Sequence, residues 1–267
     1  MWAVFSRIFK DRRVLLLIYT LSALAVLVMY ISLFPSFSKQ SASLEQLLKS
    51  YPESFMKAFN FDIKSFTTVE GYLATEQFSF MWPLLVILMS VGFASTCFAA
   101  EIEKGTIEII LSQPISKMKI FISRYLAGLS NLIIFTFVSI YAVIPLSRLW
   151  NISYNGENIW RMILLAFLFA WAIYSIGILC SSIFSDRGKV YFVSATVLVV
   201  MYVLNILASI KDSISNVKYL SFFYYFNPQK ALVYGQIDHW AYLVFAGVIF
   251  ICTIFGMIYF IKRDITT

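Results

Sequence analysis

Charged residues are scarce in this sequence: Asp, Glu, Lys and Arg make up 13% of the 267 residues, whereas hydrophobic residues make up 60%. Because soluble globular domains contain about 25% charged residues, this composition excludes an ordinary cytosolic enzyme. The net charge of +7 includes no long basic run, which excludes a nucleic-acid-binding or disordered chain. The sequence therefore predicts an integral membrane protein.

Residues that commonly carry chemistry are also few. His239 is the single histidine, and it has no partner pattern around it. The three cysteines, Cys97, Cys180 and Cys252, are odd in number and lie in apolar runs, which favours apolar filling over a disulfide framework. The apolar runs contain no paired carboxylates, H-E-x-x-H or G-x-S-x-G pattern, so we predict no catalytic residue, no metal site and no enzyme activity.

Windows free of Asp, Glu, Lys, Arg and His predict the membrane spans. Each window is long enough for a helix to cross a hydrocarbon core of about 30 Å, and a charge at its centre costs about 2.5 to 3.5 kcal/mol. The expected fold is all-α, a single transmembrane domain over 1–267. The six predicted spans are 14–34, 77–100, 125–147, 162–185, 190–210 and 240–261.

The distribution of Lys and Arg predicts the orientation in the membrane. Segments 1–13, 101–124, 186–189 and 262–267 carry 12 Lys and Arg in 47 residues, whereas the other connections carry 9 in 85. Since cytoplasmic loops are enriched in positive charge, we expect both termini on the cytoplasmic side of the cell membrane.

The N-terminal segment 1–13 alternates apolar and basic residues at helical spacing. Such a segment suits a short amphipathic helix lying at the membrane interface among anionic headgroups; alternatively it is a plain basic flank that sets orientation. The residues of this interface segment are Trp2, Phe5, Arg7, Ile8, Lys10, Arg12 and Arg13.

Two segments on the expected outer side have their own structural signals. Segment 35–76 contains capping patterns that predict short helices covering the outer face. Segment 211–239 contains six aromatic residues within 219–226, which suits either a re-entrant element or an aromatic belt at the headgroups.

A few polar and aromatic residues are candidates for a transport pathway. Amides and hydroxyls inside the spans either hold helices together or contact a substrate, and the low charge of the interior favours an amphipathic or apolar cargo. The candidates are Asn131, Thr136, Ser139, Asn205, Phe222, Phe223, Tyr224, Tyr225 and Phe226.

Segment 101–120, between the second and third spans, predicts a short cytoplasmic helix. Gly105 ends the preceding span, Thr106 can cap the short helix, Pro114 ends it and Ser116 can cap the next span. Ile107, Ile110 and Leu111 share a face at i, i+3, i+4 spacing. That apolar face either docks a partner protein or rests on the bilayer.

This segment reads EIEKGTIEIILSQPISKMKIFISRY over 101–125 and resembles the loop after the second span of ABC-transporter permeases of the type-2 export family. The shared pattern is an acidic residue, Gly-Thr, an acidic residue, an aliphatic pair, then Pro, a small residue and basic residues. By resemblance the segment is a coupling helix that contacts a separate ATPase. By the same resemblance its coupling positions would be Glu101, Glu103, Gly105, Thr106, Glu108, Pro114 and Ser116. The apolar face of Ile107, Ile110 and Leu111, predicted from its spacing, completes the expected coupling site.

The resemblance further implies a dimer of permease chains, homodimeric or with a paralogue, that is driven by nucleotide-binding ATPase subunits. No G-x-x-x-x-G-K-[ST] motif occurs in the sequence, so ATP and Mg²⁺ are expected in the partner chain and no cofactor in this one. The alternative function is a secondary carrier or channel that is not driven by ATP.

Overall fold

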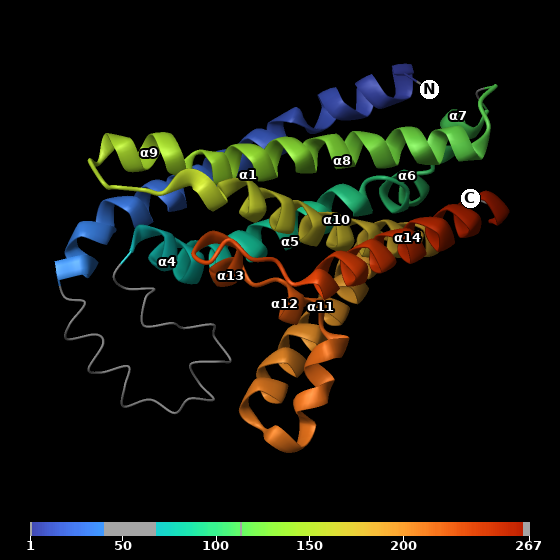
Figure 1. Cartoon of the computed structure of the whole chain (residues 1–267). Coiled ribbons are helices and arrows are strands. Elements are labelled where there is room, and N and C mark those ends of the chain that lie inside the picture. Colours follow the sequence, from blue (N-terminus) through green and yellow to red (C-terminus); the bar gives the residue numbers. More distant parts are fainter. Residues whose placement is uncertain (1, 40–67, 113, 264–267) are drawn as a thin grey trace.

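The computed structural model describes residues 2–39, 68–112 and 114–263, and every element in these ranges is a helix (Figure 1). Six helices are long and apolar enough to cross a membrane, which confirms the predicted helical fold class and the expected number of candidate spans. Some of these helices consist of several consecutive elements. The longest element of each is α1 (Trp2–Lys39), α5 (Trp82–Ser95), α8 (Lys117–Tyr141), α10 (Ile159–Ile183), α11 (Arg187–Ile210) and α14 (His239–Lys262). The expected outer cap, 35–76, falls largely on residues 40–67, outside the described residues.

Helix α1 corrects the expectation of a separate N-terminal helix. It runs for 38 residues without a break between 13 and 14. At about 1.5 Å per residue its length is about 57 Å, well beyond a hydrocarbon core of about 30 Å. The first residues therefore belong to the same helix as the first span and do not form a separate helix.

The second span is divided into several pieces. It begins with α4 (Val69–Leu73) and a π-helix, η2 (Ala74–Met81), continues as α5, and stops at Ser95. Because Pro83 near the start of α5 has no backbone N–H, the usual bonding pattern cannot pass through it, and the wider π-helical turns precede this position. After residues 96–98 come two short helices, α6 (Ala99–Glu103) and α7 (Ile107–Leu111).

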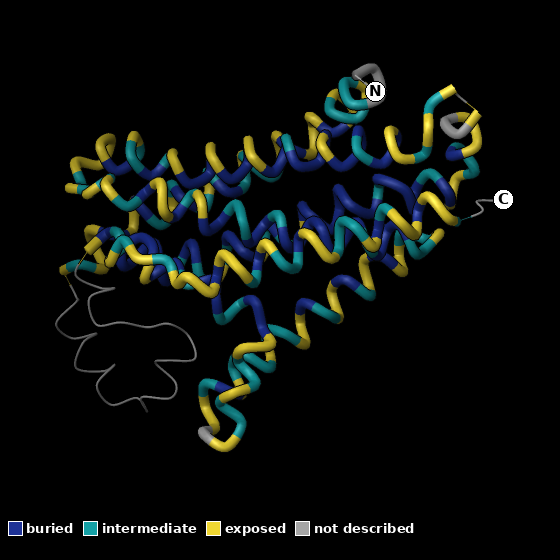
Figure 2. Tube along the Cα trace, turned by 45° about the vertical axis from the view of Figure 1, so that its right-hand side comes forward, coloured by how far each residue is buried: buried dark blue, intermediate teal, exposed yellow. Residues whose placement is uncertain are grey.

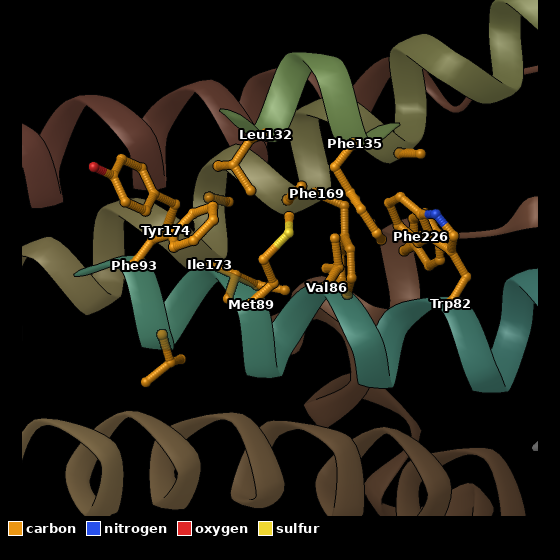
Figure 3. Packing of buried hydrophobic residues seen from close by; sticks show 14 of the residues in the cluster. Trp82, Val86, Met89, Phe93, Leu132, Phe135, Phe169, Ile173, Tyr174 and Phe226 are labelled. Carbon is orange, nitrogen blue, oxygen red and sulfur yellow. The ribbon is translucent and has the colours of Figure 1, made fainter. Parts of the chain in front are cut away.

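Helix α10 is the centre of the bundle and packs against α5, α8 and α14. Figure 3 shows aromatic side chains of α5, α8 and α10 packed together with Phe226, whose ring centroid lies 4.2 Å from that of Phe169. A Cβ added at Gly177 would lie 2.7 Å from the Cβ of Ala94, so glycine permits the close approach of α10 and α5. Small residues at such contacts are typical of membrane helix packing.

Helix α11 diverges from the rest of the bundle (Figures 1 and 2). The 3-10 segment η4 (Asp212–Leu220) returns along it, and α12 (Phe222–Tyr225) and α13 (Pro228–Leu232) lead back to the bundle before α14. Two further short elements, α9 (Val143–Leu149) and η3 (Gly156–Asn158), join α8 to α10. The two ends of the described chain and α7 lie at the same end of the bundle.

Candidate functional site

The segment between the second and third spans forms a short projection that we call the α6–α7 tip, residues 101–116. Gly105 adopts φ +68°, and a Cβ added there would meet no atom within 4 Å. The requirement for glycine is therefore the left-handed backbone, which is strained for other residues. This turn joins α6 to α7 at the end of the bundle where both ends of the described chain lie (Figure 1).

The orientation of α7 corrects part of the expected docking face. Ile107 is fully buried, with 0% exposure, and belongs to the hydrophobic core. Ile109 is 67% exposed and Glu108 is also exposed, while the side chains of Ile110 and Leu111 lie outside the described part of the structure. Sequence spacing groups residues on one face, but it does not say which face the bundle covers. Ile107 is consequently an anchor of α7 and not part of an exposed surface.

Glu101 joins the tip to the third span. Its Oε2 accepts a hydrogen bond from the Thr106 hydroxyl at 2.9 Å, and its Oε1 lies 3.5 Å from the guanidinium of Arg124 on α8. Arg124 is 2% exposed. Glu101 therefore supplies a carboxylate partner for a buried positive charge and at the same time fixes the turn at Thr106.

Arg12 and Arg124 both contact the break that follows α5. The broken helix leaves backbone carbonyls without their usual i+4 donors. Arg12 donates to the Phe93 carbonyl at 2.7 Å and Arg124 donates to the Cys97 carbonyl. The two guanidiniums replace the missing backbone donors, and this contact stabilises the break.

Cys97 lies at the centre of this arrangement, which we call the arginine cluster: Arg12, Cys97, Glu101, Arg124 and Tyr174. The Cys97 Sγ is 3.7 Å from two nitrogens of Arg12 and 3.5 Å from the Tyr174 hydroxyl. All three cysteines are free thiols. Cys97 is thus a buried polar contact as well as the apolar filler that the sequence predicts.

Arg12 corrects the expectation that all basic residues of 1–13 face the headgroups. Its exposure is 8%, because it enters the bundle, while Arg7, Lys10 and Arg13 are exposed. Phe5 and Ile8 are half-buried, and the side chain of Trp2 lies outside the described part. The basic flank therefore has one residue that belongs to the interior.

Further contacts tie the tip to the other spans. Ser181 on α10 accepts hydrogen bonds from the backbone N–H groups of Phe98 and Ala99 at 3.3 and 3.1 Å. Glu103 accepts one from the Arg187 N–H, at the start of α11, at 3.1 Å. Ser116 caps α8, as predicted, by accepting from the Lys119 N–H. Pro114, which follows α7, is exposed.

The residues suggested for a pathway separate into two groups. Asn131, Thr136, Ser139, Phe222 and Phe226 are buried, and Ser139 accepts a hydrogen bond from the Trp82 indole at 2.9 Å. By contrast, Asn205, Phe223, Tyr224 and Tyr225 line a cavity of about 560 Å³. The structure therefore brings four of the nine to one open site and leaves the others inside the bundle.

No metal centre is found among the described residues, where no group of three or more His, Cys, Asp and Glu side chains comes together. His239 is exposed at the first position of α14. The features that sequence reasoning missed are the buried positions of Arg12 and Arg124. Their one available signal was a basic residue close to the edge of an apolar window.

Comparison with known proteins identifies the family. A family model described as ABC-2 family transporter protein matches residues 2–265 of this chain. A comparison with curated proteins found no match.

Proposed function

Because the chain belongs to the ABC-2 transporter family, we propose that it is the membrane-spanning subunit of an ATP-driven exporter, coupled through the α6–α7 tip to separate ATPase subunits. The family consists of multi-pass membrane permeases without ATPase activity that work with ATPase subunits. The proposal adds the direction of transport, the role of the tip and a cytoplasmic location for the tip and both termini. ATP and Mg²⁺ would be bound by the partner chain.

The observation that carries the proposal is that the tip is exposed on one side and anchored on the other. Ile109 and Glu108 present an apolar and an acidic side chain outward. Ile107 is buried in the core, and Glu101 lies against the buried Arg124. A protein that binds the exposed side of the tip would therefore push on an element that is connected to the spans.

Side-chain contacts that link the tip to the spans could transmit a movement of the tip. From Glu101 the route reaches Arg124 on α8, then the Cys97 carbonyl at the break, and then Arg12 on α1. Glu103 makes a second connection, to the start of α11. An ATPase can shift the permease only through contacts that differ between its two states, and we infer that the break after α5 is where these contacts change.

A second permease chain, identical or paralogous, is the proposed partner within the membrane. Helix α11 stands away from the bundle and exposes large apolar side chains, among them Phe192, Val199 and Val203. An apolar cavity of about 300 Å³ lies between α5 and α11, lined by Leu88 and Leu198 among others. These surfaces suit a pathway between two bundles for an amphipathic or apolar cargo.

The variant Ile109→Arg tests the docking side of the tip. It places a charge in the proposed ATPase contact without altering a buried position, so we expect normal insertion but loss of ATPase co-purification and of cargo export. Ile110→Arg addresses the neighbouring position and should have the same effect if that residue shares the contact. Met118→Arg is the matched control, since Met118 is an exposed apolar residue on the first turn of α8.

Quantitative co-purification with the co-expressed ATPase and export from inverted vesicles would measure these effects. Normal ATPase association and export in Ile109→Arg would contradict the proposed contact. Transport of cargo by the purified permease alone would contradict the proposal as a whole and favour a carrier.

A further inference from the structure

A cavity of about 560 Å³ lies between α10, α11, η4, α12, α13 and residues 236–238 just before α14, and none of its lining residues comes from the α6–α7 tip. Its volume is within the range of about 300 to 1,000 Å³ that is typical of small-molecule sites. It is therefore large enough for a ligand and separate from the coupling contacts.

The cavity wall has an apolar part and a polar part. Leu165, Ala208, Phe223 and Ile237 supply aliphatic and aromatic surface. Ammonium, carboxylate, amide, hydroxyl and phenol groups supply the remainder. A ligand that matches both parts has a polar group joined to an apolar chain.

Positive charge exceeds negative charge at this site. Lys218, Lys230 and Asp238 line the cavity, but the Asp238 carboxylate already accepts a hydrogen bond from the Trp240 N–H at 3.0 Å and caps α14. Among the described residues, neither lysine has a carboxylate within 4 Å. The polar part of the ligand is thus expected to be anionic.

Two aromatic rings hold Lys218 in position. Its Nζ lies 5.2 Å from the ring centroid of Tyr219 and 5.3 Å from that of Tyr224. These cation–π contacts restrict the side chain while leaving its three N–H donors available to an anion. Burial raises the pKa of Tyr224, and the nearby Tyr219 and Asp238 raise it further, so the phenol stays neutral.

Asn205 adds a polar group to the cavity wall. Its side-chain oxygen is buried and has no hydrogen-bond partner among the described residues. Buried acceptors are normally satisfied, and a hydroxyl or N–H group beside the anion would satisfy this one.

We propose that this cavity binds an anionic amphiphile, in which a phosphate or carboxylate contacts Lys218 and Lys230 and an apolar chain packs on Leu165, Ala208 and Phe223. A membrane phospholipid and a water-soluble amphiphile both have this chemistry. The proposal does not depend on the role of the α6–α7 tip.

Native mass spectrometry of the full chain in neutral detergent tests the proposal. The probes are phosphatidylglycerol, phosphatidylcholine, dodecyl phosphate and inorganic phosphate, each titrated separately. We expect one saturable adduct with an anionic amphiphile, and an affinity reduced about tenfold for each lysine removed in Lys218→Gln and Lys230→Gln, because each charged hydrogen bond contributes about that factor. Lys218→Arg/Lys230→Arg should retain binding.

Lys211→Gln is the matched control, because Lys211 is an exposed lysine at the end of α11 that does not line the cavity. Tighter binding of phosphatidylglycerol identifies the membrane as the source, and tighter binding of dodecyl phosphate identifies a soluble amphiphile. Equal binding of phosphatidylcholine and phosphatidylglycerol, or unchanged affinity in the double glutamine variant, would overturn the proposal. Inorganic phosphate binding as tightly as dodecyl phosphate would overturn the role of the apolar wall.

Discussion

Replacing Glu101 by glutamine removes the negative charge of the tip while keeping the shape of the side chain. The amide oxygen of Gln can still accept the Thr106 hydrogen bond, which is 2.9 Å long in the native chain. The change therefore isolates the ionic contact with Arg124, whose guanidinium lies 3.5 Å from the carboxylate.

The expected cost follows from the geometry of this pair. At 3.5 Å, Coulomb's law gives about 5 kcal/mol for an effective dielectric constant of 20 and about 1.2 kcal/mol in water. The Arg124 side chain is 3% exposed, but that of Glu101 is 32% exposed, so solvent screens the pair and the desolvation of the arginine offsets part of the attraction. We therefore expect Glu101→Gln to lower the free energy of unfolding by about 1 to 2 kcal/mol.

A double-mutant cycle separates the pair from other effects. Glu101→Gln, Arg124→Gln and the double variant are unfolded by SDS in mixed micelles, and the free energies are compared with the native chain. The same variants are assayed for cargo-stimulated ATPase activity with the partner subunits, where we expect weaker coupling at normal ATPase association. A coupling energy indistinguishable from zero would refute the ionic link between the tip and α8, and unchanged coupling would refute its part in transmission.

Two other positions give simpler predictions. Gly105→Ala should lower the free energy of unfolding by about 1 kcal/mol, since alanine disfavours the left-handed backbone. The control Gly247→Ala on α14, where an added Cβ meets no atom within 4 Å, should not lower it. Thermal unfolding in nanodiscs measures both variants, and equal midpoints would contradict the strain argument. Ser181→Ala should lower the free energy of unfolding by about 2 kcal/mol, because two backbone N–H groups lose their acceptor. The control Ser182→Ala loses only a hydrogen bond within its own helix and should lower it less. Equal decreases in SDS unfolding would argue against the role of Ser181 at the break.

The spans could be predicted because charge is costly in lipid. Helix α14 covers His239–Lys262, and its predicted window ends at the same charged residues, since these are the first side chains that lipid does not tolerate. The family likewise followed from local sequence, because the Gly-Thr turn and the proline of segment 101–120 are residue-specific signals.

Three features could not be predicted from the same patterns. Charges in 1–13 end the apolar window, but they do not end the helix, so α1 continues through them. The break at 96–98 contains neither glycine nor proline; it is stabilised by Arg12, Arg124 and Ser181 from other helices, which no local window contains. The direction of α7 depends on which side the bundle covers, and for that reason Ile107 and not Ile109 is buried.

The two buried arginines have a consequence for biosynthesis. In the proposed orientation, Arg12 and Arg124 would count among the positive charges that hold their flanks on the cytoplasmic side during insertion. After folding, both leave solvent and donate to carbonyls of the second span. The same two positive charges thus serve first to orient the chain and later as hydrogen-bond donors inside the bundle. A neutral substitution at either position would therefore weaken the orienting signal in the nascent polypeptide and also destabilise the folded bundle.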